Sequence, residues 1–151
     1  MENDAGQRRS DGGRGCARTT EAAGVSDRAR TRQKALTGQR SYLFGLAAEE
    51  AVIRQYARQG ARLIAQRWRG SGGEIDLVFS DGGIIFVEVK ASRTHERAIA
   101  SLGSSQIQRL LCSGEAFLEE RFSTSLIDAR FDLALVDQGM RIKILENAIS
   151  A

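Results

Sequence analysis

Residues 73–90 read GEIDLVFSDGGIIFVEVK, two apolar runs separated by a glycine-bearing break. β-branched and aromatic residues dominate both runs, and the break at residues 81–83 is typical of a hairpin turn, so the stretch predicts two antiparallel strands. Asp76, Glu88 and Lys90 nevertheless lie inside these runs. Because a charged group is costly to bury unless it is paired or binds a metal, the three residues indicate a functional site.

The length of the turn decides whether the two acids meet. Side chains alternate between the faces of a strand with a period of two. A three-residue loop at 81–83 pairs Ser80 with Ile84 and places Asp76 opposite Glu88, whereas a loop of two or four residues puts the acids on opposite faces unless a bulge intervenes. Opposite residues have Cβ atoms about 4.5–5.5 Å apart, so the three-residue loop allows one hard cation to bridge both carboxylates.

The hairpin belongs to a wider set of motifs. Residues 45–50 read GLAAEE, residues 130–132 read RFD, and residues 147–148 read NA. Together with the hairpin, these motifs resemble the bacterial YraN family, small proteins related to the restriction-endonuclease-like, or PD-(D/E)xK, nucleases. The resemblance covers roughly residues 45–148. It implies an α/β fold in which a mixed β-sheet is flanked by helices, in the order αβββαββ.

The resemblance also implies roles for individual residues. Asp76, Glu88 and Lys90 match the triad of these nucleases. Glu49 matches the helical acid of the Holliday-junction-resolvase-like members. Ile75 stands where the superfamily's name has a proline, a position that the metal does not touch. The function implied is a metal-dependent endonuclease that hydrolyses phosphodiester bonds in DNA, including branched or structured DNA.

Oxygen ligands favour Mg²⁺ or Mn²⁺ as the cofactor of such a site. We expect Asp76 and Glu88 to bind the ion directly, with the backbone carbonyl of Val89 as a third ligand. Glu49 would join through a water or hold a second ion. Since two carboxylates within reach keep the ammonium of Lys90 protonated, we expect Lys90 to position water and stabilise transition-state charge rather than act as a base.

Several other polar residues are weaker candidates. Glu74 falls opposite Lys90 in the same register, and it is a metal ligand, a salt-bridge partner of that lysine or an exposed strand-end residue. Gln106, at the start of a predicted helix, and Arg93, in a predicted polar loop, are candidates for nucleic-acid contact. Asp132, two residues after an arginine, is expected to form a structural pair.

Other chemistries find little support in the sequence. His95 is the only histidine, and its polar neighbours predict a surface residue. Cys16 and Cys112 have no metal-ligand spacing and are not expected to form a disulfide. No glycine-rich phosphate loop is present, so hydrolysis of nucleoside triphosphates is not supported.

The N-terminal part has a different composition from the rest. Residues 1–38 contain almost no large apolar side chains, which predicts a disordered basic tail ahead of an endonuclease-like domain at 39–151. Residues 1–40 carry nine Lys and Arg against five Asp and Glu, a net charge of +4, whereas residues 41–151 carry 13 against 14, a net charge of −1. The tail could tether nucleic acid, but a solvated extension is the interpretation we favour.

Helices are predicted over 42–59, with Gly60 as C-cap, and over 107–118, with Gly114 at a close contact with the sheet; strands are predicted over 63–68, 131–135 and 140–144. No apolar run approaches the roughly 20 residues that span a bilayer, so we expect a cytoplasmic protein without a membrane partner.

DNA is the expected partner, and a homodimer carries over from resolvase-like relatives only as an analogy. Two alternative functions remain open: a catalytically silent nucleic-acid-binding module, and a protein whose tail recruits a repair complex.

Overall fold

The computed structural model describes residues 20–123 and 127–149. The chain divides into two compact units, residues 1–39 and 40–151, and every strand lies in the second. The elements follow in the order α1 (Thr20–Arg58), β1 (Arg62–Gly70), β2 (Gly73–Ser80), β3 (Ile84–Ala91), α2 (His95–Ala100), α3 (Ser104–Phe122), β4 (Ala129–Val136) and β5 (Ile142–Ile149).

The five strands form one mixed sheet in the order β1-β2-β3-β4-β5. Strands β3 and β4 are parallel, and the other neighbouring pairs are antiparallel. Since parallel neighbours need a long crossover, α2 and α3 occupy the connection between β3 and β4. The predicted fold class is confirmed: the protein is α/β, with a mixed sheet flanked by helices in a restriction-endonuclease-like arrangement. Helix α2 adds one element to the predicted order.

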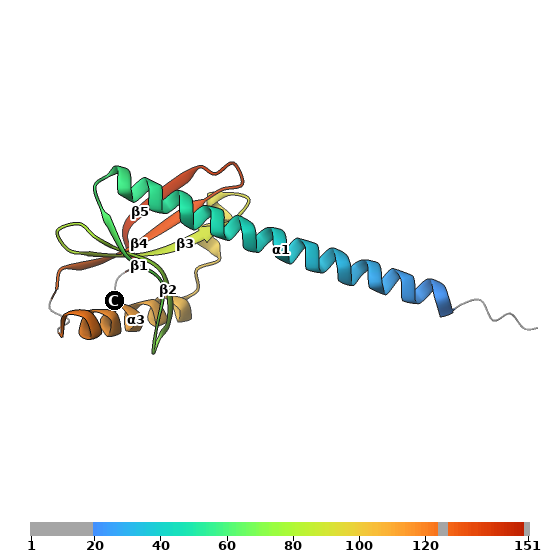
Figure 1. Cartoon of the computed structure of the whole chain (residues 1–151), viewed down its shortest axis with the longest axis horizontal. Helices are drawn as coiled ribbons and strands as arrows, with labels where there is room; N and C mark the ends of the chain where they lie inside the picture. The colour runs from blue at the N-terminus through green and yellow to red at the C-terminus, as the bar shows by residue number, and fades with distance from the viewer. Residues whose placement is uncertain (1–19, 124–126, 150–151) are drawn as a thin grey trace, which may run out of the picture. The chain divides into compact units, whose positions relative to one another are not determined.

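Helices cover the two faces of the sheet (Figure 1). On one face the C-terminal part of α1 supplies Tyr56, whose ring stacks on Phe79 with centroids 4.5 Å apart. On the other face α3 supplies Phe117, which meets Phe86 edge to face at 5.6 Å. Burying an aromatic side chain of this kind contributes roughly 1.5–3 kcal/mol, so both helices are held by the sheet they cover.

The hairpin has the predicted register. Ser80 pairs with Ile84, so residues 81–83 form a three-residue loop. Gly82 adopts φ +70°, a left-handed conformation that glycine tolerates without steric cost. The ladder between β2 and β3 ends at the pair Leu77 and Val87. The strands therefore separate just before the acidic residues.

Two glycines have the roles that the sequence predicts. Gly60 has φ +94°, and the N–H of Ala61 donates to the carbonyl of Tyr56 at 3.1 Å, which is the Schellman arrangement of a helix end. Gly114 lies in α3 against the sheet, where a Cβ atom would collide with the ring of Phe131. The cost of a glycine inside this helix is thus explained by the close approach of helix and strand.

Helix α1 begins at Thr20, well before the predicted start at Tyr42. Residues 20–38, predicted to be disordered, lie in this helix, and residues 27–43 are exposed along it. The segment is rich in Ala, Arg, Lys and Gln, which favour helix even where nothing is buried, and the prediction weighed burial alone. Residues 1–19 of the predicted tail lie outside the described residues, and the division into tail and domain stays a prediction.

Two smaller predictions of local structure were wrong. Of residues 92–97, predicted as a polar loop, 92–94 do lie outside helix and strand, but 95–97 begin α2. Thr94 Oγ1 accepts from the N–H of Arg97 at 3.4 Å and caps this helix. Met140, predicted to lie in the last strand, has φ +61° in the turn before β5. Among the described residues, no helix combines the length and the apolar character needed to cross a membrane.

Asp132 holds three elements together from inside the core. Its side chain is fully buried and accepts hydrogen bonds from Tyr56 Oη at 2.7 Å and from the N–H of Asn147 at 2.9 Å. Arg130 Nε lies 3.1 Å from the same carboxylate, which confirms the predicted structural pair. Burial, then the bond to Asp132, raises the pKa of Tyr56 far above its usual value. The cluster links α1, β4 and β5.

Candidate functional site

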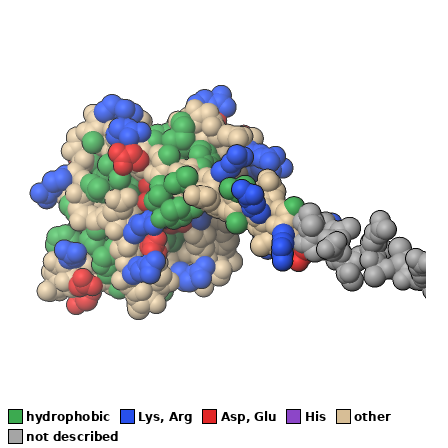
Figure 2. All heavy atoms as spheres, turned by 45° about the vertical axis from the view of Figure 1, so that its right-hand side comes forward, with side chains coloured by type: hydrophobic (Ala, Val, Ile, Leu, Met, Phe, Trp, Pro, Cys, Tyr) green, Lys and Arg blue, Asp and Glu red, His purple; other side chains and the backbone are tan. Residues whose placement is uncertain are grey.

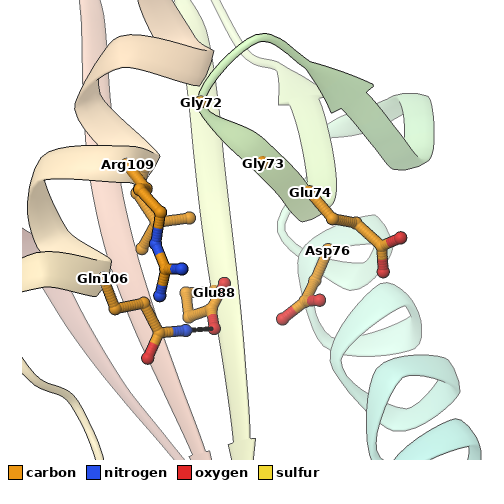
Figure 3. Close-up of a pocket in the computed structure, with 8 residues that line it drawn as sticks. Gly72, Gly73, Glu74, Asp76, Glu88, Gln106 and Arg109 are labelled. Atoms are coloured by element: carbon orange, nitrogen blue, oxygen red, sulfur yellow. Dashed lines mark hydrogen bonds between the residues drawn. The ribbon is translucent and has the colours of Figure 1, made fainter.

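The acidic residues of the hairpin face a pocket of about 300 Å³ between the sheet and α3. Asp76 enters from β2 and Glu88 from β3, while Gln106 and Arg109 enter from α3 (Figure 3). The complete lining consists of Gly72, Gly73, Glu74, Asp76, Glu88, Gln106, Arg109 and Leu110. The two predicted carboxylates are therefore brought to one cavity, together with a predicted amide and a guanidinium that was not predicted.

Asp76 occupies the point where β2 and β3 separate. The N–H of Val89, beyond the end of the ladder, donates to Asp76 Oδ2 at 2.7 Å. The carboxylate thus takes the place of a strand carbonyl as acceptor. Burial, followed by the charge of Glu88, raises the pKa of Asp76 to about 7, against the lowering effect of the Val89 N–H. Removal of the carboxylate from water and the nearby charge of Glu88 thus both favour the protonated form of Asp76.

Glu88 is buried and is held by two groups. Lys90 Nζ lies 2.8 Å from Glu88 Oε1, as expected of residues two apart on one strand face. Gln106 Nε2 donates to the same oxygen at 2.5 Å. The structure thus brings Glu88, Lys90 and Gln106 into contact, and Val89 lies beside them through its bond to Asp76.

Glu49 lies on α1 beside the pocket, not in its lining. It is buried, and its carboxylate accepts from Arg67 Nη2 at 3.2 Å and from Gln66 Nε2 at 3.3 Å, both on β1. Its charge also contributes to the raised pKa of Asp76, after that of Glu88. Glu49 is therefore near the site, but its carboxylate is hydrogen-bonded to side chains of β1. This arrangement fits a water-mediated contact with a metal ion better than direct binding of the ion.

Glu74 does not pair with Lys90, and that prediction was wrong. The residues of β2 that precede Leu77 do not pair with β3. Glu74 instead pairs with Arg69 of β1, whose Nε lies 2.7 Å from Glu74 Oε2. Figure 3 shows the carboxylate of Glu74 directed away from Glu88. Glu74 thus forms a salt bridge that was not predicted, and the interpretation of Glu74 as a metal ligand stays a prediction.

Arg109 is the pocket residue that the sequence reasoning missed. It follows Gln106 by three positions, so both lie on one face of α3. The helix can approach the turn after β1 because Gly72 has no side chain: a Cβ there would lie 2.5 Å from the carbonyl oxygen of Arg109 and 2.7 Å from Ser113 Oγ. Two features of the sequence could have indicated this contact: Gly72 directly before the strand with the acids, and Arg109 three residues after Gln106.

Two weak candidates lie elsewhere. Arg93 does not line this pocket but lines a separate groove. His95 is partly buried, with Nε2 2.9 Å from the carbonyl oxygen of Arg141, so it serves as a structural contact more than as the free surface residue predicted. Cys112 is exposed and reduced, and Cys16 lies outside the described residues.

The chain is similar to many bacterial proteins. Residues 48–136 match the model described as "Uncharacterised protein family UPF0102". A UPF0102 protein of Roseobacter denitrificans is 45% identical over 121 residues, which cover 80% of this chain and 94% of that protein. A UPF0102 protein of Ruegeria pomeroyi is 48% identical over 112 residues, covering 74% and 91%. A UPF0102 protein of Cereibacter sphaeroides is 44% identical over 117 residues, covering 77% and 100%. The chain therefore belongs to the UPF0102 family, which is the YraN family that its motifs resemble.

Proposed function

We propose that the protein hydrolyses phosphodiester bonds in DNA with the help of Mg²⁺ or Mn²⁺ bound at Asp76 and Glu88. The observation that carries the proposal is the convergence of these two carboxylates on one cavity that also contains Arg109, with Lys90 held against Glu88. A site with carboxylates to bind a metal cation and with basic side chains to bind an anion suits a negatively charged substrate.

The residues present fit a hard divalent cation. Within 20–123 and 127–149, no three His, Cys, Asp or Glu side chains lie close enough to form a metal site of their own. Mg²⁺ commonly binds through one or two carboxylates and keeps waters and substrate phosphate as its other ligands. Asp76 and Glu88 supply such a pair, and the charge repulsion that raises the pKa of Asp76 is what a cation between them would relieve. The bound ion would supply Lewis acidity and an acidified water.

The other side chains have roles that follow from their contacts. Gln106 and Lys90 hold Glu88 Oε1 in one orientation. Lys90, paired with Glu88, is positioned to bind the attacking water or a phosphate oxygen. Arg109 presents a guanidinium to the same cavity, and a guanidinium matches the geometry of a phosphate with two parallel hydrogen bonds. Glu49, whose charge acts on Asp76, would contribute through a bound water.

The experiment is a cleavage screen of labelled single-stranded, duplex, flap and four-way-junction DNA, and of RNA of the same sequences, with Mg²⁺, Mn²⁺ or EDTA. We expect cleavage of DNA with metal only, and its loss in Asp76→Ala and Glu88→Ala. Glu50→Ala is the matched control, because Glu50 is an exposed acid of α1 paired only with Arg54. Full cleavage activity in Asp76→Ala or Glu88→Ala, or an equal loss of activity in Glu50→Ala, would contradict the proposed site. Cleavage of RNA alone would overturn the assignment to DNA.

A further inference from the structure

A second groove, of about 640 Å³, opens beside the end of β3. Four segments of the unit 40–151 meet there: the part of α1 before Glu49, the residues that follow Lys90, α2, and the turn between β4 and β5. Its lining consists of Arg40, Ser41, Phe44, Ala91, Ser92, Arg93, Arg97 and Gln138. This volume lies within the roughly 300–1,000 Å³ of typical ligand pockets, so the groove is large enough to receive a nucleotide.

The groove is basic. Arg40, Arg93 and Arg97 are exposed, and its lining contains no acidic residue. Among the residues that the structure describes, none of these three arginines forms an ion pair. On the face drawn in Figure 2, basic side chains are widely spread and acidic ones are fewer. Three arginines around one cavity, in a domain whose net charge is close to zero, indicate a place for an anion with several charges.

The groove lies just beyond the end of the strand that carries Glu88 and Lys90, although its lining shares no residue with that of the proposed active site. Ala91 ends β3 one residue after Lys90, and Ser92 and Arg93 follow it in the loop before α2. Three residues of extended chain span at most about 11 Å. A nucleic-acid strand rises about 3.4 Å per nucleotide along a helix, so a strand cut at Lys90 would bring its next two or three phosphates to the groove.

Phe44 adds an aromatic surface to the arginines. It lies four residues after Arg40 on α1, hence on the same helix face, and it is only partly buried. Proteins that bind single strands combine a basic groove for the phosphates with aromatic rings on which unpaired bases stack. A duplex offers no such base, because its bases are stacked inside.

The geometry points to a binding site for a single-stranded segment of the DNA substrate, with its phosphates on Arg40, Arg93 and Arg97 and one unpaired base on Phe44. This inference rests on the proposed function and makes it more specific: the enzyme cuts next to an unpaired segment. The arginines set affinity through charge, and the phenyl ring sets the preference for a single strand over a duplex.

The test measures binding without cleavage. A fluorescein-labelled 12-nucleotide single strand of mixed sequence is titrated with the full chain in EDTA, and anisotropy gives the Kd at several salt concentrations. The triple variant Arg40→Ala, Arg93→Ala, Arg97→Ala is compared with a control triple variant, Arg54→Ala, Arg58→Ala, Arg121→Ala, whose arginines are also exposed but lie outside the groove. Thermal melts confirm that both are folded.

We expect the groove variant to bind at least 10-fold more weakly and the control less than 2-fold. The slope of log K against log salt should fall by roughly 2, since each phosphate contact of a single strand contributes about 0.7. Phe44→Leu keeps an apolar side chain, and it should weaken binding about 5-fold or more without changing that slope. The affinity for a 12-base-pair duplex should not change in Phe44→Leu.

Other results would overturn the inference. Equal affinity of the groove variant and the control would show that the arginines do not bind DNA. If Phe44→Leu weakened the binding of duplex and single strand equally, Phe44 would not be the contact for an unpaired base. Displacement of the oligonucleotide by sodium triphosphate at equal phosphate concentration would assign the groove to a small polyphosphate. The binding assay does not require cleavage. A protein that cleaves no substrate, but whose groove variants bind the oligonucleotide more weakly as expected, would therefore contradict the nuclease proposal and support the binding site.

Discussion

Gln106 Nε2 donates to Glu88 Oε1 at 2.5 Å, which joins the first turn of α3 to the strand that carries two of the proposed catalytic residues. The helix is held in turn against the sheet by Phe117 and by the absence of a side chain at Gly114. The orientation of the acidic oxygen is therefore set by the packing of an entire helix. Groups that orient a metal ligand from behind commonly affect affinity or activity by 10–100-fold.

The contact predicts that Gln106→Ala lowers the rate of metal-dependent cleavage by about 10–100-fold and raises the Mn²⁺ concentration needed for half-maximal rate. The reason is that Glu88 loses one of its two partners and becomes free to turn. Gln108→Ala, an exposed glutamine of the same helix, is the matched control. If the two variants need the same Mn²⁺ concentration, Gln106 does not position the ligand.

The pKa of Asp76 predicts how stability depends on pH. In the folded protein this pKa is raised from 3.8 to about 7, first by burial and then by Glu88. The folded state therefore keeps a proton that the unfolded chain has released, and the parent loses stability as pH rises from about 4 to about 7. Asp76→Asn removes this loss, so in EDTA at pH 8 the variant should be more stable than the parent by about 1 kcal/mol, with no advantage at pH 4.

Urea denaturation of both proteins at the two pH values measures this difference. Added Mg²⁺ or Mn²⁺ at pH 8 should stabilise the parent and not Asp76→Asn, because only a ligand bound to the folded state raises the free energy of unfolding. A variant that is less stable at pH 8, or that gains as much from metal as the parent, would mean that Asp76 is a structural residue.

Arg109 should contribute to the chemical step. Its guanidinium faces the cavity of Asp76 and Glu88, where the negative charge of the substrate would develop. Removing one such donor commonly costs about 10²–10³-fold in kcat. We expect Arg109→Ala to fall in this range, Arg109→Lys to recover part of the loss, and Arg121→Ala, further along α3, to have no effect. Single-turnover rates with excess enzyme separate this effect from binding; an unchanged rate in Arg109→Ala would contradict the assignment.

The buried cluster around Asp132 should affect stability and not catalysis. Tyr56→Phe removes the hydroxyl that donates to Asp132 at 2.7 Å and leaves a buried carboxylate with one partner fewer. The expected loss is about 1–3 kcal/mol in the free energy of unfolding, with kcat unchanged below the melting temperature. Val52→Ala, an apolar truncation on the same helix face, serves as a control for packing alone. A fall in kcat at full folding would connect Asp132 to the active site.

Local patterns were enough to predict the hairpin. A three-residue turn and period-two alternation decide the pairing of Ser80 with Ile84, and both are visible in consecutive residues. The partner of Glu74 was not visible in the same way, because it depends on where the β2–β3 ladder ends, at Leu77, and on the pairing of β2 with β1, which continues to Gly73.

The positions of α1 and Arg109 required other information. The start of α1 depends on helix propensity in a segment whose residues 27–43 are exposed, and an argument from burial gives no prediction for such a segment. Arg109 belongs to the site because α3 crosses the sheet at Gly72, a tertiary contact that no local pattern in α3 contains. The sequence thus predicted which acids share a strand face. It did not predict that α3 would place the guanidinium of Arg109 next to them.

The hydrogen bond from the Val89 N–H to Asp76 provides the protein with its own spectroscopic reporter. Amides within the β2–β3 ladder donate to carbonyl groups, which do not titrate in this pH range. This one amide donates to a carboxylate whose pKa is raised to about 7. Its ¹⁵N chemical shift in an NMR spectrum follows the charge of Asp76, and a cation reaching that carboxylate would change the same resonance. A single peak thus reports the ionisation of the pocket in the absence of any substrate.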